Sequence, residues 1–154
     1  MRGRSARNCV RWGLEAVALD RLTAEARSRN MARIRSKVTK PEVALRRIVY
    51  RLGYRYRLHN QKLPGRPDVV FRGRKKVIFV HGCFWHAHQN CKIAHVPRSR
   101  LRYWRPKLER TRARDGRNRA ELENLGWKCL TVWECELVNP HAIEKRVTRF
   151  LDSA

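Results

Sequence analysis

The chain has 154 residues, and its 37 Lys and Arg against 13 Asp and Glu give a formal charge of +24 at pH 7. This length is enough to bury the core of one domain without disulfides. Such a positive surface attracts polyanions, so DNA or RNA is the expected partner, and it repels its own copies, so we expect a monomer. No apolar run is long enough to span a membrane, and no signal-peptide core is found. The expected location is therefore the cytoplasm and, with DNA as the partner, the nucleoid. A membrane surface is a weaker alternative partner, because the arginines are scattered through the chain.

The first regular element is expected after a basic N-terminal stretch. Residues 1–28 mix Arg with Ala and carry only a short apolar patch, so they are interpreted as a variable extension with some helical propensity. Thr39 and Glu42 match the two ends of a capping box, which predicts that a helix begins there. Apolar residues follow at helical spacing, and Gly53 is placed to end this helix.

Strand and helix patterns alternate along the rest of the chain. Aromatic and β-branched runs predict a half-buried strand and then the two strands of a hairpin, at residues 54–58, 68–71 and 77–80. Because Pro106 interrupts a helical composition, the next continuous helix is expected to run from Pro106 to Gly126. A strand at 129–133 and a last helix from Asn139 follow. This order indicates an α/β fold, with a small mixed sheet covered by helices.

Metal-ligand residue types are densest at residues 81–91, where three His and two Cys occur in eleven positions. Cys83, His88 and Cys91 have the types and short spacing of zinc ligands. Cys135 lies just after a predicted strand and is the best fourth candidate. The alternative is that the cysteines are reduced core thiols and the histidines are surface residues. Because five cysteines occur without a secretion signal, a disulfide framework is not expected.

Two histidines of the same stretch, His81 and His86, are left without a zinc role. They are candidates for acid/base catalysis, or each hydrogen-bonds a zinc ligand instead. Asp68 is an isolated acid that the hairpin would bring near them, so it is a candidate ligand for a catalytic Mg²⁺, with a turn or cap role as the alternative. Glu42 and Asp115 are secondary candidates, since the first could serve only the capping box and the second only neighbouring arginines.

Aromatic side chains in basic surroundings are candidates for DNA contact. Phe84 and Trp85 follow a predicted strand, and Trp104 lies in an Arg-rich stretch. Apolar side chains on a basic surface can wedge between base steps and unstack them, while phosphate contacts compensate for the lost stacking. The alternative is that all three pack in the core.

Four motifs, in this order and spacing, resemble the very short patch repair (Vsr) family of DNA mismatch endonucleases: LPGRPD at 63–68, VIFVHGCFWH at 77–86, LGW at 125–127 and VWEC at 132–135. The similarity covers residues 27–154 and leaves residues 1–26 as a variable basic extension. It implies a restriction-endonuclease-like α/β fold, a small mixed sheet flanked by helices, with a structural Zn²⁺ site. It also implies a Mg²⁺-dependent endodeoxyribonuclease that nicks one strand 5′ to the T of a T:G mismatch, left by deamination of 5-methylcytosine, to start very short patch repair.

Two other functions compete with this one. The first is a restriction-type nuclease that cuts undamaged DNA, and the second is a non-catalytic, zinc-stabilised DNA-binding module. Product analysis on matched duplex DNA separates the first from a mismatch enzyme. Against the second, every position that catalysis requires is filled.

The resemblance also assigns roles to the catalytic candidates. Asp68 matches the family's metal-binding aspartate, and Val80 stands where a backbone carbonyl contacts the Mg²⁺. His86 is expected to activate the attacking water, and His81 to act on the phosphate or the leaving group. Two further acids match supporting positions near this site, Glu42 and Asp115.

The remaining matches concern zinc and DNA. The zinc ligands match at Cys83, His88, Cys91 and Cys135. The aromatics that intercalate beside the mismatch match at Phe84, Trp85 and Trp104, and positions near the opposite groove at Met31 and Ile34. The sequence departs from the family at two places: the gap between His88 and Cys91 is one residue longer, and Thr111 stands where Asn is expected.

Overall fold

The structure is a computed structural model that describes residues 38–58, 60–94 and 100–153, with the single positions Thr23, Ala26 and Arg29. The chain divides into two units, 1–35 and 36–154, and the elements given below belong to the second. Met31, Ile34 and most of the predicted 1–26 extension lie outside the described residues. Within the described ranges, no helix is both long and apolar enough to cross a membrane.

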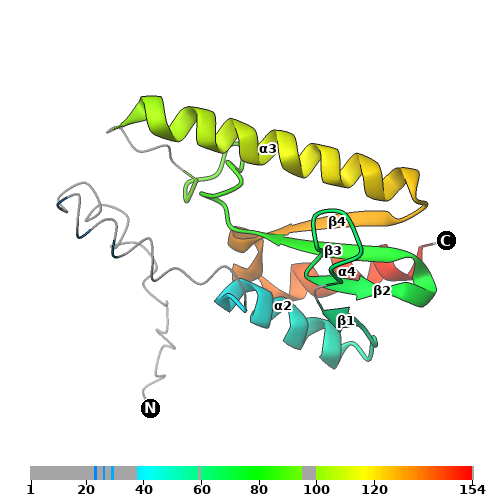
Figure 1. Cartoon of the computed structure of the whole chain (residues 1–154). Helices are drawn as coiled ribbons and strands as arrows, with labels where there is room; N and C mark the ends of the chain where they lie inside the picture. The colour runs from blue at the N-terminus through cyan, green and yellow to red at the C-terminus, as the bar shows by residue number, and fades with distance from the viewer. Residues whose placement is uncertain are drawn as a thin grey trace, which may run out of the picture. The chain divides into compact units, whose positions relative to one another are not determined.

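A four-stranded mixed sheet forms the centre of the second unit, in the order β1-β2-β3-β4 (Figure 1). Its strands are β1 (Arg57–Leu58), β2 (Val69–Phe71), β3 (Lys76–His81) and β4 (Lys128–Trp133). Neighbours are antiparallel from β1 to β3, whereas β3 and β4 are parallel. The predicted hairpin is therefore confirmed as β2 and β3, joined through the short 3-10 helix η2 (Arg72–Arg74).

Helices cover both faces of the sheet: α2 (Lys40–Arg51) and α4 (Pro140–Asp152) lie on one face and α3 (Leu101–Asn124) on the other (Figure 1). Successive residues of a strand point to opposite faces. Accordingly, Ile78 of β3 packs in the larger core cluster with residues of α2 and α4, whereas the adjacent Val77 packs with Leu122 of α3. The prediction of a small mixed sheet flanked by helices is confirmed.

The helix α2 begins where the capping box predicts. The Thr39 hydroxyl oxygen accepts a hydrogen bond from the Glu42 backbone N–H, and the helix ends at Arg51, two residues before Gly53. Leu45, Ile48 and Val49 form its buried face. The capping signal and the apolar spacing were thus sufficient to place this helix.

The predicted start of α3 is wrong. The helix begins at Leu101, and Pro106 lies inside it. Proline removes one intrahelical hydrogen bond, but the first turn is held independently because Trp104 is buried against aromatic side chains of another loop. The predicted end is correct: Gly126 has a φ of +77°, and the N–H of Trp127 donates to the Leu122 carbonyl, as in a Schellman motif.

The predicted strand at 54–58 is shorter than expected. Only Arg57 and Leu58 pair with β2, which is itself only three residues long. Tyr54 and Tyr56 nevertheless lie half-buried and pack edge-on against Phe71. The alternating pattern therefore placed Tyr54 and Tyr56 correctly, but Leu58 is exposed, and the predicted hydrogen-bonded ladder was too long.

Candidate active site and metal-ligand cluster

The chemically important residues gather at the carboxyl end of the two parallel strands. His81 ends β3, Trp133 ends β4, and the two are partners in the ladder. The chain after β3 forms the loop of residues 82–94, and the chain after β4 forms the short 3-10 helix η3 (Glu134–Val138). Because the strands end side by side, these two segments meet although they are far apart in the sequence.

Four residues that were predicted as zinc ligands come together here, and we call them the metal-ligand cluster: Cys83, His88, Cys91 and Cys135. Their donor atoms all lie within 4.8 Å of one another. The Cys135 Sγ is 3.5 Å from the His88 Nδ1, and the Cys135 backbone N–H donates to the Cys83 Sγ at 3.4 Å. Tetrahedral zinc, with bonds of about 2.0 to 2.3 Å, needs donors roughly 3.3 to 3.8 Å apart. The 3.5 Å between Cys135 and His88 lies in this range and the donor types suit zinc, so the cluster could hold a metal ion.

Burial controls the charge state of this cluster. Cys83 is fully buried, and its burial raises the pKa of the thiol to about 12, a value to which hydrogen bonds with Cys135 and Cys91 contribute in both directions. A buried thiolate is unfavourable unless a cation compensates its charge. A metal ion at this position would replace the thiol proton, so burial alone does not oppose binding.

The longer gap between His88 and Cys91 does not move Cys91 away from the other donors. Ala87 and Asn90 adopt left-handed conformations, with φ of +48° and +55°, and the His88 backbone N–H donates to the Cys83 carbonyl at 3.0 Å. Left-handed residues turn the chain sharply, and asparagine adopts this conformation more readily than most. The extra residue is accommodated in an exposed turn at Gln89 and Asn90.

A second group consists of three residues. Two of them are His81 and His86, which we call the histidine pair, and the third is Asp115, whose carboxylate contacts His86. The two imidazole rings stack with centroids 3.8 Å apart and planes 9° apart. The His86 Nδ1 lies 2.6 Å from an Asp115 carboxylate oxygen. Donor atoms of these three residues also lie within 4.8 Å of one another. However, nitrogen lone pairs lie in the ring plane, so two parallel stacked rings do not both point at one ion. The geometry therefore favours proton transfer over metal binding.

The charges of the histidine pair are set by burial and by each other. Burial, together with the charge of His86, lowers the pKa of His81 to about 4, against a smaller opposing effect of Asp115, so His81 is neutral at pH 7. Burial alone would raise the pKa of Asp115, but the hydrogen bond and charge of His86 outweigh it and lower that pKa, so Asp115 stays ionised. When Nδ1 of His86 carries the proton shared with Asp115, its Nε2 is an acceptor, the state that a general base requires.

Asp68 comes just before β2, the strand that pairs with β3. Its carboxylate accepts a hydrogen bond from the Val80 backbone N–H at 2.7 Å, which places it next to the residue before His81. Asp68 is half-buried at the start of β2. The hairpin thus brings the predicted metal-binding pair, Asp68 and Val80, together beside His81. A carboxylate next to the main chain is an oxygen donor set of the kind that Mg²⁺ takes.

Glu42, the other predicted supporting acid, lies in the cap of α2. One carboxylate oxygen accepts from the Val38 backbone N–H at 3.0 Å and pairs with Arg46 at 3.0 Å, and the other accepts from the Thr39 hydroxyl at 2.9 Å. The side chain is 6% exposed. These contacts involve both oxygens and place Glu42 in the cap of α2, with the Val38 N–H as donor where a capping box uses the N–H of the N-cap residue.

The predicted wedge residues form one aromatic group, with Phe84 5.0 Å from Trp85 and 5.2 Å from Trp104 between ring centroids. Trp104 is only 6% exposed, and the other two are half-buried. Sequence reasoning missed Tyr103 and Lys107, although they lie four residues apart on one helix face, close to Trp104. The Lys107 ammonium lies 5.3 to 5.5 Å from the ring centroids of Tyr103, Trp104 and Trp85.

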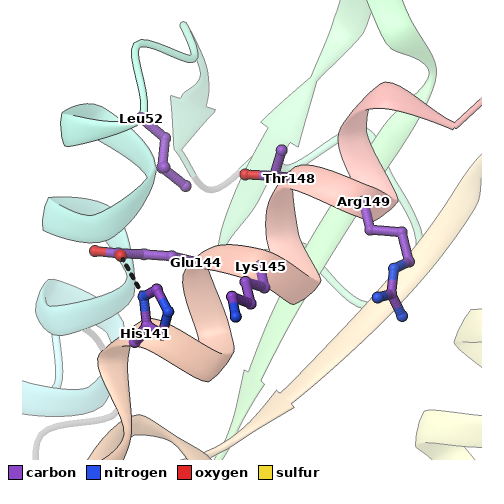
Figure 2. Close-up of a pocket in the computed structure, with 6 residues that line it drawn as sticks. All are labelled: Leu52, His141, Glu144, Lys145, Thr148 and Arg149. Carbon is purple, nitrogen blue, oxygen red and sulfur yellow. Dashed lines mark ion pairs between the residues drawn. The ribbon is translucent and has the colours of Figure 1, made fainter.

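A shallow pocket of about 460 Å³ lies elsewhere, between α4 and the end of α2 (Figure 2). It is lined by Leu52, His141, Glu144, Lys145, Thr148 and Arg149. Its acid, Glu144, pairs with Arg51 at 3.0 Å and with His141 at 3.7 Å. None of the predicted site residues lines this pocket, so the chemistry belongs to the end of β3 and β4.

The chain is similar to DNA endonucleases over most of its length. A family model described as DNA mismatch endonuclease Vsr matches residues 19–92. The type II nicking enzyme V.XorIIP of Xanthomonas oryzae is 51% identical over 133 residues, which cover 86% of this chain and 97% of that protein. The type II nicking enzyme V.NmeAIP of Neisseria meningitidis is 41% identical over 132 residues, covering 86% and 94%. The DNA mismatch endonuclease Vsr of Escherichia coli is 41% identical over 111 residues, covering 72% and 70%.

These similarities agree with the fold and with the site. The matched family model spans Asp68, the histidine pair's two rings and three of the four members of the metal-ligand cluster. A small mixed four-stranded sheet with three helices is the restriction-endonuclease-like architecture of this family, and its members are DNA-cleaving hydrolases. The resemblance that the motifs indicated is confirmed, and the chain belongs to the Vsr family of DNA mismatch endonucleases.

Proposed function

We propose that this enzyme nicks one strand of duplex DNA 5′ to the T of a T:G mismatch, the product of 5-methylcytosine deamination. The nick would start very short patch repair of the DNA of the nucleoid, in the cytoplasm. The observation that carries the proposal is the stack of His81 on His86, which Asp115 contacts, with the Asp68 carboxylate bonded to the residue before His81. A relative at 51% identity is named a nicking enzyme and another at 41% a mismatch endonuclease. The first name favours a single-strand cut over cleavage of both strands, and the second favours a mismatch as the target.

The catalytic step follows from the positions of these side chains. Asp115 orients His86, so that its Nε2 accepts the proton of the attacking water. His81, neutral and stacked on His86, would donate a hydrogen bond to the phosphate or the leaving oxygen. Asp68 and the Val80 carbonyl would hold a Mg²⁺, which neutralises charge that develops on the phosphate. Asp68→Ala is therefore expected to remove nicking and to leave duplex binding largely intact; loss of both would make Asp68 a structural residue.

The metal-ligand cluster is proposed to hold a structural Zn²⁺. Three cysteines and one histidine would supply four protein ligands, the set that is typical of structural zinc. Cys135 comes from η3 and the other ligands from the loop after β3, so the ion would tie the two segments together. The catalytic loop would thereby be held at the end of the parallel strands.

Recognition of the mismatch is proposed to use the aromatic group and the basic surface of α3. Phe84 and Trp85, packed on the buried Trp104, would wedge beside the mismatch, where unstacking costs least because the T:G pair is less stable than a matched pair. Exposed cations line α3, at Arg102, Arg105, Lys107, Arg110, Arg112, Arg114, Arg117 and Arg119. They would bind backbone phosphates, so affinity should fall steeply with salt. A monomer is sufficient for a single nick.

The test is incubation of the full chain with an end-labelled duplex that contains one T:G mismatch in a CT(A/T)GG context, with Mg²⁺ or EDTA, beside the matched duplex. We expect a Mg²⁺-dependent nick 5′ to the T, with no cut in the matched DNA. Cleavage of the matched duplex would indicate a restriction-type nuclease. Binding without a nick would indicate a non-catalytic module or another recognition sequence.

A further inference from the structure

The indole of Trp133 lies between the metal-ligand cluster and the histidine pair. Its ring stacks on the His88 imidazole, with centroids 4.0 Å apart and planes 5° apart. It also meets the His81 ring edge-on, at 5.3 Å and 76°. His81 in turn stacks on His86, which Asp115 holds. Among the described residues, a continuous series of ring contacts therefore runs from a predicted metal ligand to a predicted general base.

The backbone around Trp133 is fixed by β4 on one side and by η3 on the other. Trp133 ends β4 and is the ladder partner of His81, so the two side chains start from adjacent strands. Its backbone N–H donates to the Glu136 carboxylate at 2.8 Å, which fixes the start of η3. Two residues later, Cys135 belongs to the metal-ligand cluster. The indole is thus anchored by the sheet on one side and by the cluster on the other.

We propose that Trp133 is a positioning residue, which holds the His81 ring in the orientation that stacks on His86. This inference rests on the proposed catalytic role of the histidine pair. Because the Trp133 ring lies parallel to the His88 ring, the His81 ring meets the indole edge-on. In this orientation the His81 ring stacks on His86, with centroids 3.8 Å apart. The placement of His88 by the metal-ligand cluster is transmitted to the catalytic rings through this one side chain.

The main test compares Trp133→Leu with Trp133→Phe in the full chain. The leucine removes the flat ring, and the phenylalanine retains one. In Trp133→Leu we expect unchanged zinc content, an unchanged Kd for the mismatched duplex, and a kcat lower by about 10- to 100-fold, as for a small displacement of a catalytic group. Trp133→Phe should restore most of the kcat.

A spectroscopic readout separates positioning from simple packing. Because the two rings stack, we expect the ring current of His81 to shift the imidazole C–H signals of His86 in the folded enzyme. Trp133 contacts His81 and His88, so a change at His86 in Trp133→Leu reports the His81–His86 stack. We expect these NMR signals to move toward the values of an unstacked histidine in the leucine variant, and to stay shifted in the phenylalanine variant.

Two further variants control for folding. Trp127 precedes β4 at its opposite end and packs with Val70, Val77 and Leu122. Trp127→Leu makes the same substitution outside the series of ring contacts. It should therefore lower the Tm while leaving kcat and the His86 signals unchanged. If Trp133→Leu does not fold, His88→Cys tests the series from its other end, because it retains four metal donors but removes the ring under Trp133. It should retain zinc, lower kcat and move the His86 signals.

The outcomes separate this proposal from the proposed function. Unchanged kcat and unchanged His86 signals in Trp133→Leu would overturn the positioning role, and loss of zinc from that variant would show that Trp133 acts on the cluster instead. If the wild-type enzyme nicks no T:G duplex, the proposed function fails. The His86 signals would still report whether Trp133 sets the stack.

Discussion

The metal-ligand cluster and the histidine pair both draw residues from the loop after β3 and use similar residue types, yet their geometries differ. In both groups the donor atoms lie within 4.8 Å of one another. In the first, the thiol of Cys135 and the imidazole of His88 point at each other, at 3.5 Å. In the second, the rings of His81 and His86 lie face to face, and an aspartate holds one of them. Proximity of histidines and acids therefore does not define a metal site, and the orientation of the rings separates the two roles.

Burial acts on both groups, with different results. It raises the pKa of the Cys83 thiol to about 12 and lowers the pKa of His81 to about 4. Each shift disfavours the charged form of the side chain. At Cys83 a bound cation would reverse the effect, because a metal stabilises the thiolate. At His81 the neutral imidazole is the form that the proposed mechanism requires, since it would donate a hydrogen bond without carrying charge.

The largest effect is expected when the metal-ligand cluster is broken. Cys135→Ser should release the metal and reduce the free energy of unfolding by several kcal/mol, roughly 10 °C or more in Tm. Metal analysis and calorimetry measure both quantities. Cys129→Ser is the matched control, because Cys129 lies half-buried beside Trp127 on the α3 face and outside the cluster. An unchanged Tm with full metal content in Cys135→Ser would remove Cys135 from the ligand set.

Two histidines, two residues apart in sequence, test the difference between the groups directly. His86→Ala should lower kcat by about 10²- to 10⁴-fold, as for loss of a general base, while the metal content stays at the wild-type level. His88→Ala should instead lower the metal content and the Tm. The comparison would be contradicted if His86→Ala lost the metal, or if His88→Ala kept it.

A smaller loss is expected at the acid of the histidine pair. Asp115→Asn keeps the shape of the side chain but no longer stabilises a proton shared with His86, so kcat should fall by roughly 10- to 100-fold. Single-turnover nicking measures this loss apart from product release. Asp152→Asn, which changes an exposed acid paired with Tyr54 and Arg74, should leave the rate unchanged. An equal rate in both variants would make the His86–Asp115 contact incidental.

The mildest variant concerns the turn that precedes Asp68. Gly65 has a φ of +70°, and a Cβ there would lie 3.0 Å from the Asn118 side chain on α3. Gly65→Ala should therefore shift the turn, cost about 1 kcal/mol in stability and lower kcat several-fold, with the metal content unchanged. Gly53→Ala has a similar φ of +84° but open space around it, so it isolates the backbone strain. Equal kcat in the two variants would show that crowding at Asn118 does not reach Asp68.

Local signals in the sequence predicted much of the fold. The capping box placed the start of α2, the Gly126 signal placed the end of α3, and β-branched runs predicted the β2–β3 hairpin. The start of α3 was missed, because burial of Trp104 against Phe84 holds the turns that Pro106 would otherwise destabilise. That contact joins residues from different parts of the chain, and no local pattern contains it.

The candidate site divides in the same way. Residue type and spacing were sufficient to propose the members of the metal-ligand cluster, and the structure brings those four together. The stack of His81 on His86 and the bridging position of Trp133 were not predicted. They depend on the left-handed turn at Ala87 and on the parallel pairing of β3 with β4, which only the folded chain defines.

The most direct test of the difference between the two groups is metal analysis of the purified full chain combined with zinc K-edge X-ray absorption. We predict one zinc per chain, with a shell of three sulfurs and one nitrogen from the metal-ligand cluster. The shell should be unchanged in His86→Ala. A second zinc with nitrogen and oxygen ligands, lost in His86→Ala, would show that the histidine pair is itself a metal site and would contradict its assignment to proton transfer.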